Sequence, residues 1–301
     1  MKMKSLTIAM LMASLSAVSG TAFAEASYYG SIRVGIDAAD DGNDTNTSLR
    51  NYASRLGFKA ESDLNNGLTA FGHYEFGVDT NSSDNGNGAM STRKAYVGLK
   101  GDWGRVRLGQ DYHTFYHFGQ ELTDQGYWDT CLPCLGDSSF RTGDAISYDG
   151  TFGNFSVGAT GYAGDAEHGD GYELGMAGKF GPEQSKITVT AAVRDTDGPR
   201  GTGDDPLWTI GAGGKFAGLN AAVSYFENGD DNSFSTHFGY DFGNSDAYVN
   251  IGQIDPDVGE KTTPWAVGYG IAVGAKTTVW FEYSDFDNDV THARAALKYD
   301  F

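Results

Sequence analysis

Apolar and polar residues alternate with a period of two along most of this chain, which is typical of β-strands that expose one apolar face. The alternation is clearest at the end of the chain, where one face is apolar and closes on aromatic rings while the other carries charge. That apolar face consists of Thr291, Ala293, Ala295, Leu297, Tyr299 and Phe301. The same period recurs in residues 186–194 and 264–273. The pattern predicts an all-β protein.

About sixteen segments share this alternation, and the connections between them differ in length. The expected strands are 26–37, 54–62, 68–79, 92–100, 105–111, 144–150, 155–162, 171–180, 186–194, 207–216, 219–228, 233–242, 246–254, 264–273, 276–286 and 290–301. Tight turns such as Gly101 to Gly104 follow the even-numbered strands. The connections after the odd-numbered strands are mostly longer and rich in Asp, Asn and Gly, as in Asp40 to Asp44. Tight turns at one end and loops at the other predict a transmembrane antiparallel up-and-down β-barrel.

The first 24 residues have the layout of a cleavable export signal. Lys2 and Lys4 precede an apolar stretch from Leu6 to Val18, and Ala22-Phe23-Ala24 supplies the small residues that a signal peptidase requires. We therefore expect a signal peptide over residues 1–24 and one barrel domain over residues 25–301. The expected location is the bacterial outer membrane.

Composition narrows the function classes. The expected signal peptide contains two lysines and no acidic residue, so its removal leaves 19 of the 21 basic residues against 40 acidic ones. The net charge of residues 25–301 is then −21. Such a chain lacks the basic surface that nucleic-acid binding needs. Its 17 Tyr, 18 Phe and 43 Gly fit strands and turns better than a disordered acidic chain. A soluble β-sandwich would also alternate, but it would not combine export, sixteen segments, loops at one end and a terminal aromatic residue.

At this point the chain resembles the general, non-specific porins of Gram-negative bacteria, which are sixteen-stranded trimeric channels. The resemblance covers residues 25–301. It rests on Tyr28-Tyr29-Gly30, Ser54-Arg55-Leu56-Gly57-Phe58, Ala95-Tyr96-Val97-Gly98-Leu99, Gly104-Arg105-Val106-Arg107-Leu108-Gly109 and Lys298-Tyr299-Asp300-Phe301. The resemblance implies a homotrimer, and it implies that terminal Phe301 belongs to the signal read by barrel-assembly machinery.

The connection from Tyr112 to Gly143 is the longest in the chain, and loops of that length are usually functional. Sixteen tilted strands enclose a backbone diameter of roughly 32 Å, which is too wide for a protective channel unless something restricts it. The connection is rich in aromatic and leucine residues that could pack against an inner wall. In general porins the loop at this position folds into the lumen, so we expect an inward-folded third loop. An extracellular cap is the alternative.

Charged residues divide between the expected wall and this third loop. The resemblance implies that wall cations face loop carboxylates across a narrow pore. The candidate constriction residues are Arg33, Arg55, Lys59, Lys94, Arg107, Glu121, Asp124 and Asp129.

The third loop also carries Cys131-Leu132-Pro133-Cys134, for which we expect a local disulfide because export leads to an oxidising compartment. A zinc site that adds His113 and His117 is an alternative. No grouped nucleophile, base and orienting residue indicates an enzyme.

The sequence therefore predicts passive diffusion of small hydrophilic solutes and ions, with weak cation selectivity and no cofactor or metal. Expected partners are outer-membrane lipid, lipopolysaccharide and two further copies of the chain. One alternative is a substrate-specific channel, which would show a line of lumen aromatics; Tyr29, Phe71, Tyr96 and Trp280 have lumen parity but lie on scattered strands. A non-transport barrel, either an adhesin or an outer-membrane hydrolase, is the other.

Overall fold

The computed structural model describes residues 25–64, 67–80, 90–129, 132, 140–165, 169–182, 185–197, 202–287 and 290–301. The expected signal peptide and both cysteines lie outside these residues.

The described residues form a single β-sheet wall with one short π-helix inside it. The elements are β1 (Glu25–Asp40), β2 (Thr45–Asn51), β3 (Arg55–Asp63), β4 (Thr69–Val78), β5 (Met90–Gly101), β6 (Gly104–Tyr112), η1 (Tyr116–Gln120), β7 (Arg141–Thr142), β8 (Ala145–Phe152), β9 (Phe155–Asp165), β10 (Gly169–Phe180), β11 (Ile187–Thr196), β12 (Leu207–Phe216), β13 (Leu219–Asn228), β14 (Asp231–Asp241), β15 (Ser245–Asp255), β16 (Trp265–Gly274), β17 (Thr277–Asp285) and β18 (Thr291–Asp300).

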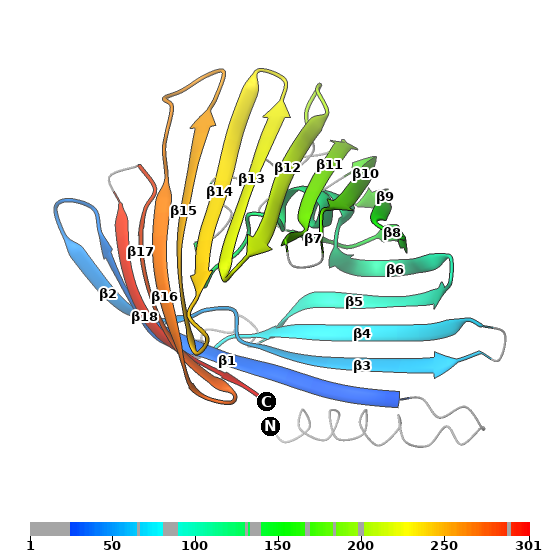
Figure 1. Ribbon diagram of the computed structural model, residues 1–301, viewed down its shortest axis with the longest axis horizontal. Helices are drawn as coiled ribbons and strands as arrows, with labels where there is room; N and C mark the ends of the chain where they lie inside the picture. Colours follow the sequence, from blue (N-terminus) through cyan, green and yellow to red (C-terminus); the bar gives the residue numbers. More distant parts are fainter. Residues whose placement is uncertain are drawn as a thin grey trace.

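The wall is a closed antiparallel barrel of sixteen strands (Figure 1). Two pairs of segments are halves of single wall strands, because β2 and β3 both pair with β1, and β7 and β8 both pair with β6. The barrel closes between β1 and β18, in a register that runs from Ser31 opposite Asp300 to Asp40 opposite Thr291. The expected fold class and strand count are confirmed.

The two faces of the wall differ in chemistry as the alternation predicted. On β10, Leu174 and Met176 are exposed on the outer face, while Glu173, which directly precedes Leu174, is fully buried on the inner face. The outer face thus presents apolar side chains to lipid and the inner face presents polar ones to a lumen. No helix among the described residues is long and apolar enough to span a membrane.

The second wall strand is longer than the sequence pattern indicated. Residues 45–51 were expected to lie in a long loop, but they form β2, and only residues 41–44 make the turn. The Asp41 carboxylate accepts hydrogen bonds from the Asn43 and Asp44 amides at 2.9 and 2.8 Å, which stabilises this tight turn. The strand is interrupted at residues 52–54, where Ala53 has a φ of 60°. Because of this interruption, the Tyr52 side chain is buried against other aromatic rings.

Candidate functional site

The segment of residues 113–129, which follows β6, lies against the inner face of the wall. At its start the Thr114 and Thr160 hydroxyl oxygens are 2.8 Å apart, and the Phe115 amide donates to the Glu173 carboxylate at 2.7 Å. Glu173 alternates with lipid-facing residues along β10, so a segment bonded to it lies inside the barrel. We call residues 113–129 the lumen segment.

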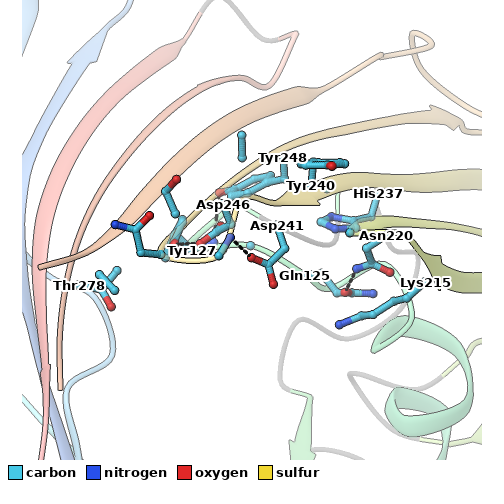
Figure 2. Close-up of a pocket in the computed structure, with 18 of the residues that line it drawn as sticks. Gln125, Tyr127, Lys215, Asn220, His237, Tyr240, Asp241, Asp246, Tyr248 and Thr278 are labelled. Atoms are coloured by element: carbon cyan, nitrogen blue, oxygen red, sulfur yellow. Dashed lines mark hydrogen bonds between the residues drawn. The ribbon is translucent and has the colours of Figure 1, made fainter. Parts of the chain in front are cut away.

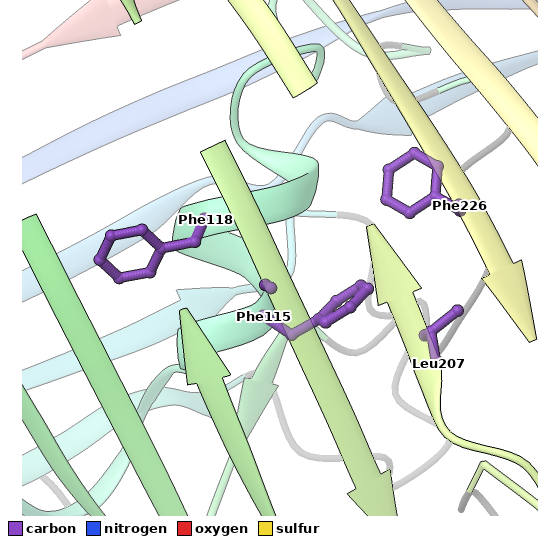
Figure 3. Packing of buried hydrophobic residues seen from close by; sticks show 5 residues of the cluster. Phe115, Phe118, Leu207 and Phe226 are labelled. Carbon is purple, nitrogen blue, oxygen red and sulfur yellow. The ribbon is translucent and has the colours of Figure 1, made fainter. Parts of the chain in front are cut away.

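Apolar side chains hold the first half of the lumen segment to the wall. Phe115 is fully buried in a cluster with Leu207 and Phe226 of the wall, and Phe118 belongs to the same cluster (Figure 3). A Cβ atom added at Gly158 or Gly175 would lie only 2.5 or 2.6 Å from the Phe118 ring. The ring therefore occupies a hollow that exists because these two neighbouring strands carry glycine there.

Wall side chains also fix the backbone of the lumen segment along its length. The Ser224 hydroxyl donates to the Gly119 carbonyl at 3.1 Å, and the Asn250 amide donates to the Gln125 carbonyl at 3.1 Å. Near the end, the Glu282 carboxylate accepts from the Trp128 amide at 3.1 Å and from the Asp129 amide at 3.2 Å. The segment is thus attached from β9 round to β17.

Aromatic rings complete the attachment at the far end. Tyr127 stacks on Trp280 with ring centroids 5.4 Å apart, and its hydroxyl donates to Asp246 at 2.6 Å. Trp128 packs edge-on against Tyr52 at 5.1 Å. The interruption between β2 and β3 therefore provides a contact for the segment.

The three expected acidic constriction residues have different partners. Asp129 forms an ion pair with Arg294 of β18 and accepts from the Ser284 hydroxyl at 2.6 Å. Asp124 accepts from the Tyr116 hydroxyl at 2.8 Å. Burial, with the Asp124 carboxylate close by, raises the pKa of the Tyr116 phenol above its usual value, so the hydroxyl stays protonated as a donor. Glu121 Oε2 lies 2.9 Å from His117 Nδ1.

Some of the basic residues expected at the constriction form ion pairs with carboxylates, and others do not. Lys94 pairs with Asp111 at 3.1 Å, and Arg107 is 3% exposed between Asp111 and Asp149. Within the part of the chain that the structure describes, no ion pair involves Arg33, Arg55 or Lys59. Their polar contacts are to uncharged groups, for example Arg33 Nε to the Ser31 hydroxyl at 2.9 Å.

Two arginines near Arg55, Arg93 and Arg141, were not predicted from the sequence. Arg93 pairs with Glu75 at 2.8 Å, whereas Arg141 stacks over the Tyr112 ring at 5.0 Å and has no ion pair among the described residues. Both interact electrostatically with Arg55. Arg141 lies in a strand segment of two residues, which is too short for an alternation to mark it.

A hollow of about 620 Å³ separates the end of the lumen segment from the tight-turn end of β12–β18 (Figure 2). Tyr127 and Gln125 of the segment line one side, and the turns at Ala217 and Asn244 line the other. Asn220 donates to the Gln125 side chain in this hollow. The lumen therefore continues past the segment toward the tight turns.

The structure also places Phe301, His113 and His117, which were singled out in the sequence. The Phe301 amide donates to the Gly30 carbonyl at 3.0 Å and its carbonyl accepts from the Gly30 amide at 3.1 Å, so the terminal residue is part of the closing strand pair. His113 Nδ1 lies 3.2 Å from Glu173 Oε2 and accepts from the Tyr116 amide at 3.1 Å. His117 lies beside Glu121, as described above. The imidazole rings of the two histidines thus contact other residues of the chain. The proposed disulfide of Cys131 and Cys134 falls outside the described residues.

The family model described as Gram-negative porin matches residues 9–291, which is nearly the whole chain. The chain belongs to the Gram-negative porin family. A putative outer membrane porin protein NmpC of Escherichia coli is 36% identical over 36% of this chain. That alignment spans 26% of the relative, so the chain matches about a quarter of the length of the curated protein.

Solved structures share the fold over nearly the whole chain. Salmonella typhi OmpF, in a complex with daunomycin, superposes with a TM-score of 0.79 at 18% identity over 92% of this chain and 97% of that one. An in-vitro folded trimer form of OmpT from Vibrio cholerae gives a TM-score of 0.71 at 14% identity over 92% and 99%. This porin is accordingly a multi-pass β-barrel of the bacterial outer membrane.

Proposed function

We propose that this porin is a passive diffusion channel for small hydrophilic solutes and ions, and that it is not an enzyme. The observation that carries the proposal is the attachment of the lumen segment to the wall from β9 to β17, which leaves the inner face of β1 and β3–β7 as the opposite side of an open passage. A polar inner face provides hydrogen-bonding groups along such a passage. Family membership supports a homotrimer, and the trimer form of OmpT is an example of that assembly within the fold.

We further propose that Arg33, Arg55, Lys59 and Arg141 face Glu121 and Asp124 across the narrowest part of the passage. Lys94, Arg107 and Asp129, also expected there, contribute little net charge because each is ion-paired. The uncompensated charge at the constriction is then positive, whereas the loop-side turns carry acidic residues such as Asp40 and Asp41. The constriction therefore favours anions, whereas the loop-side mouth favours cations.

Ionic strength separates the two contributions. The Debye length is about 10 Å at 0.1 M salt and about 3 Å at 1 M, so salt screens the mouth before it screens the constriction. We therefore propose that the weak cation selectivity predicted from the sequence holds at low salt and declines as salt rises.

Reversal potentials across a planar bilayer in a KCl gradient test this proposal. A charge about 6 Å from the ion path contributes roughly 0.3 kcal/mol after screening, which changes the cation-to-anion permeability ratio about threefold. The double variant Arg55→Gln/Lys59→Gln should therefore become clearly more cation-selective. Lys261→Gln, which removes an exposed cation paired with Asp255, is the control and should change the ratio less. Equal shifts in both variants would contradict the assignment of Arg55 and Lys59 to the constriction.

A further inference from the structure

Three of the four lumen aromatics that looked scattered in the sequence lie in one row on the inner wall. Tyr29 and His73 have ring centroids 5.8 Å apart, His73 and Tyr96 are 5.3 Å apart, and Tyr96 and Phe71 are 6.2 Å apart. His73 bridges the row, because its two ring nitrogens lie 2.7 Å from the Tyr29 hydroxyl and 2.9 Å from the Tyr96 hydroxyl. We call Tyr29, Phe71, His73 and Tyr96 the aromatic shelf.

Strand pairing explains why the sequence conceals this shelf. Lys59 pairs with His73, and His73 pairs with Tyr96, so residues on β3, β4 and β5 fall into one line across the wall. Glycine makes room beside the rings: an added Cβ at Gly98 would lie 2.6 Å from the Phe71 ring. Tyr29 lies on β1, Phe71 and His73 on β4, and Tyr96 on β5, so the row forms only in the folded sheet.

A hollow of about 230 Å³ lies over part of the shelf and is rimmed by cations. Phe71, His73 and Tyr96 line it together with four cationic side chains and one acidic side chain. The cations are Lys59, Lys94, Lys100 and Arg105, and the acid is Glu61. The hollow therefore combines apolar ring surface with a surplus of positive charge.

The cations differ in how readily they can contact a ligand. Lys94 and Arg105 are ion-paired with Asp111 and Asp149. The Lys100–Glu61 pair, at 2.6 Å, has side chains 39% and 52% exposed, and such exposed pairs are worth little, so Lys100 can exchange its partner. Lys59 lies 4.9 Å over the Tyr29 ring and has no ion pair within the described parts of the chain.

We propose that this hollow is a binding subsite for small aromatic carboxylates, with benzoate as the simplest example. The ring of the solute lies against Phe71 and Tyr96, and its carboxylate contacts Lys59 and Lys100. Ring-to-ring contact adds to burial of apolar area, and it discriminates a planar ring from an aliphatic one of similar size. Lys59 lies four residues after Arg55 on β3, and both side chains are on the same face of the strand. The subsite therefore adjoins the proposed constriction. This inference rests on the channel function proposed above.

Block of ion current tests the subsite in the intact, folded porin. Potassium benzoate added to KCl should reduce the single-channel current in a concentration-dependent way, and potassium cyclohexanecarboxylate or acetate should do so less. Phe71→Leu and Tyr96→Leu should each weaken the benzoate block by about two- to tenfold, the range that aromatic pairs give. Lys59→Gln should also weaken it.

Controls separate ring contact from folding and from the channel function itself. Tyr96→Phe keeps the ring and should retain the block, and Tyr269→Leu removes an exposed outer-face ring and should not change it. Equal block by benzoate and cyclohexanecarboxylate in a conducting wild-type channel would overturn the subsite alone. Benzoate block that survives both Phe71→Leu and Tyr96→Leu in folded, conducting variants would overturn it as well. Absence of any KCl conductance would overturn the proposed channel function.

Discussion

Adding one methyl group at Gly158 should move the lumen segment into the channel. The new Cβ would lie 2.5 Å from Phe118 Cε2 and 3.2 Å from Thr114 Cγ2, whereas carbon atoms pack favourably at about 3.5–4.0 Å. The ring must therefore withdraw by roughly 1 Å. The ring already fills the space over Gly175 on the next strand, where an added Cβ would lie 2.6 Å from it, so the wall offers it little room to slide. The remaining direction is away from the wall, and the π-helix η1 moves with the ring.

The expected cost is that of overpacking, about 1–3 kcal/mol, which a sixteen-stranded barrel can absorb without unfolding. We expect Gly158→Ala to fold, to conduct less per channel than the wild type, and to slow large sugars more than small ones in a liposome-swelling assay. Adding Phe118→Ala removes the clashing ring atoms and should restore conductance toward the wild-type value. Gly161→Ala on the same strand is the matched control, because nothing lies within 4 Å of its added Cβ.

Unchanged conductance and solute selectivity in a folded Gly158→Ala variant would refute the reasoning. So would a double variant that conducts even less than Gly158→Ala, because the defect would then not arise from contact with the Phe118 ring.

Two other predictions follow from contacts in the structure, and a third tests the disulfide expected from the sequence. Replacing Glu173 by Ala leaves the Phe115 amide and the Tyr162 hydroxyl without their acceptor and buried Arg194 without its ion-pair partner. Each unsatisfied hydrogen-bonding group costs about 1–3 kcal/mol, so open-channel current noise should increase while the barrel remains folded, and a quiet wild-type-like trace would contradict this prediction. Deleting Phe301 removes the residue that bonds with Gly30 and should lower the yield of the heat-modifiable folded form in outer membranes, whereas a normal yield would count against the assembly signal. Mass spectrometry of non-reduced peptides should show Cys131 joined to Cys134, and two free thiols, or bound zinc that Cys131→Ser abolishes, would exclude that bond.

Periodicity predicted the wall well because lipid imposes it. Each strand crosses an apolar layer, so every second residue must be apolar, and that requirement is visible one strand at a time. Residues 45–51 escaped the prediction because they include polar Thr45, Asn46 and Ser48 and extend the hairpin through backbone pairing with β1. Backbone hydrogen bonds require no particular side chains, so the sequence carries little sign of them.

The site was less predictable because its properties depend on contacts between distant strands. The sequence gives the charge of Asp129, but not its ion pair with Arg294, which lies 165 residues away. Likewise, Lys94 and Arg107 have the parity of lumen residues, yet Lys94 pairs with Asp111, and Arg107 pairs with both Asp111 and Asp149. The aromatic shelf was divided among separate strands in the sequence and forms only through their register.

The measurement that tests the central claim most directly is single-channel recording of the purified, folded porin in a planar bilayer. A passive, water-filled passage predicts discrete conductance steps whose size rises in proportion to KCl concentration over a wide range, with a linear current–voltage relation at low voltage. Folded protein that inserts without conductance steps would contradict the account, and so would a KCl current that saturates at low concentration.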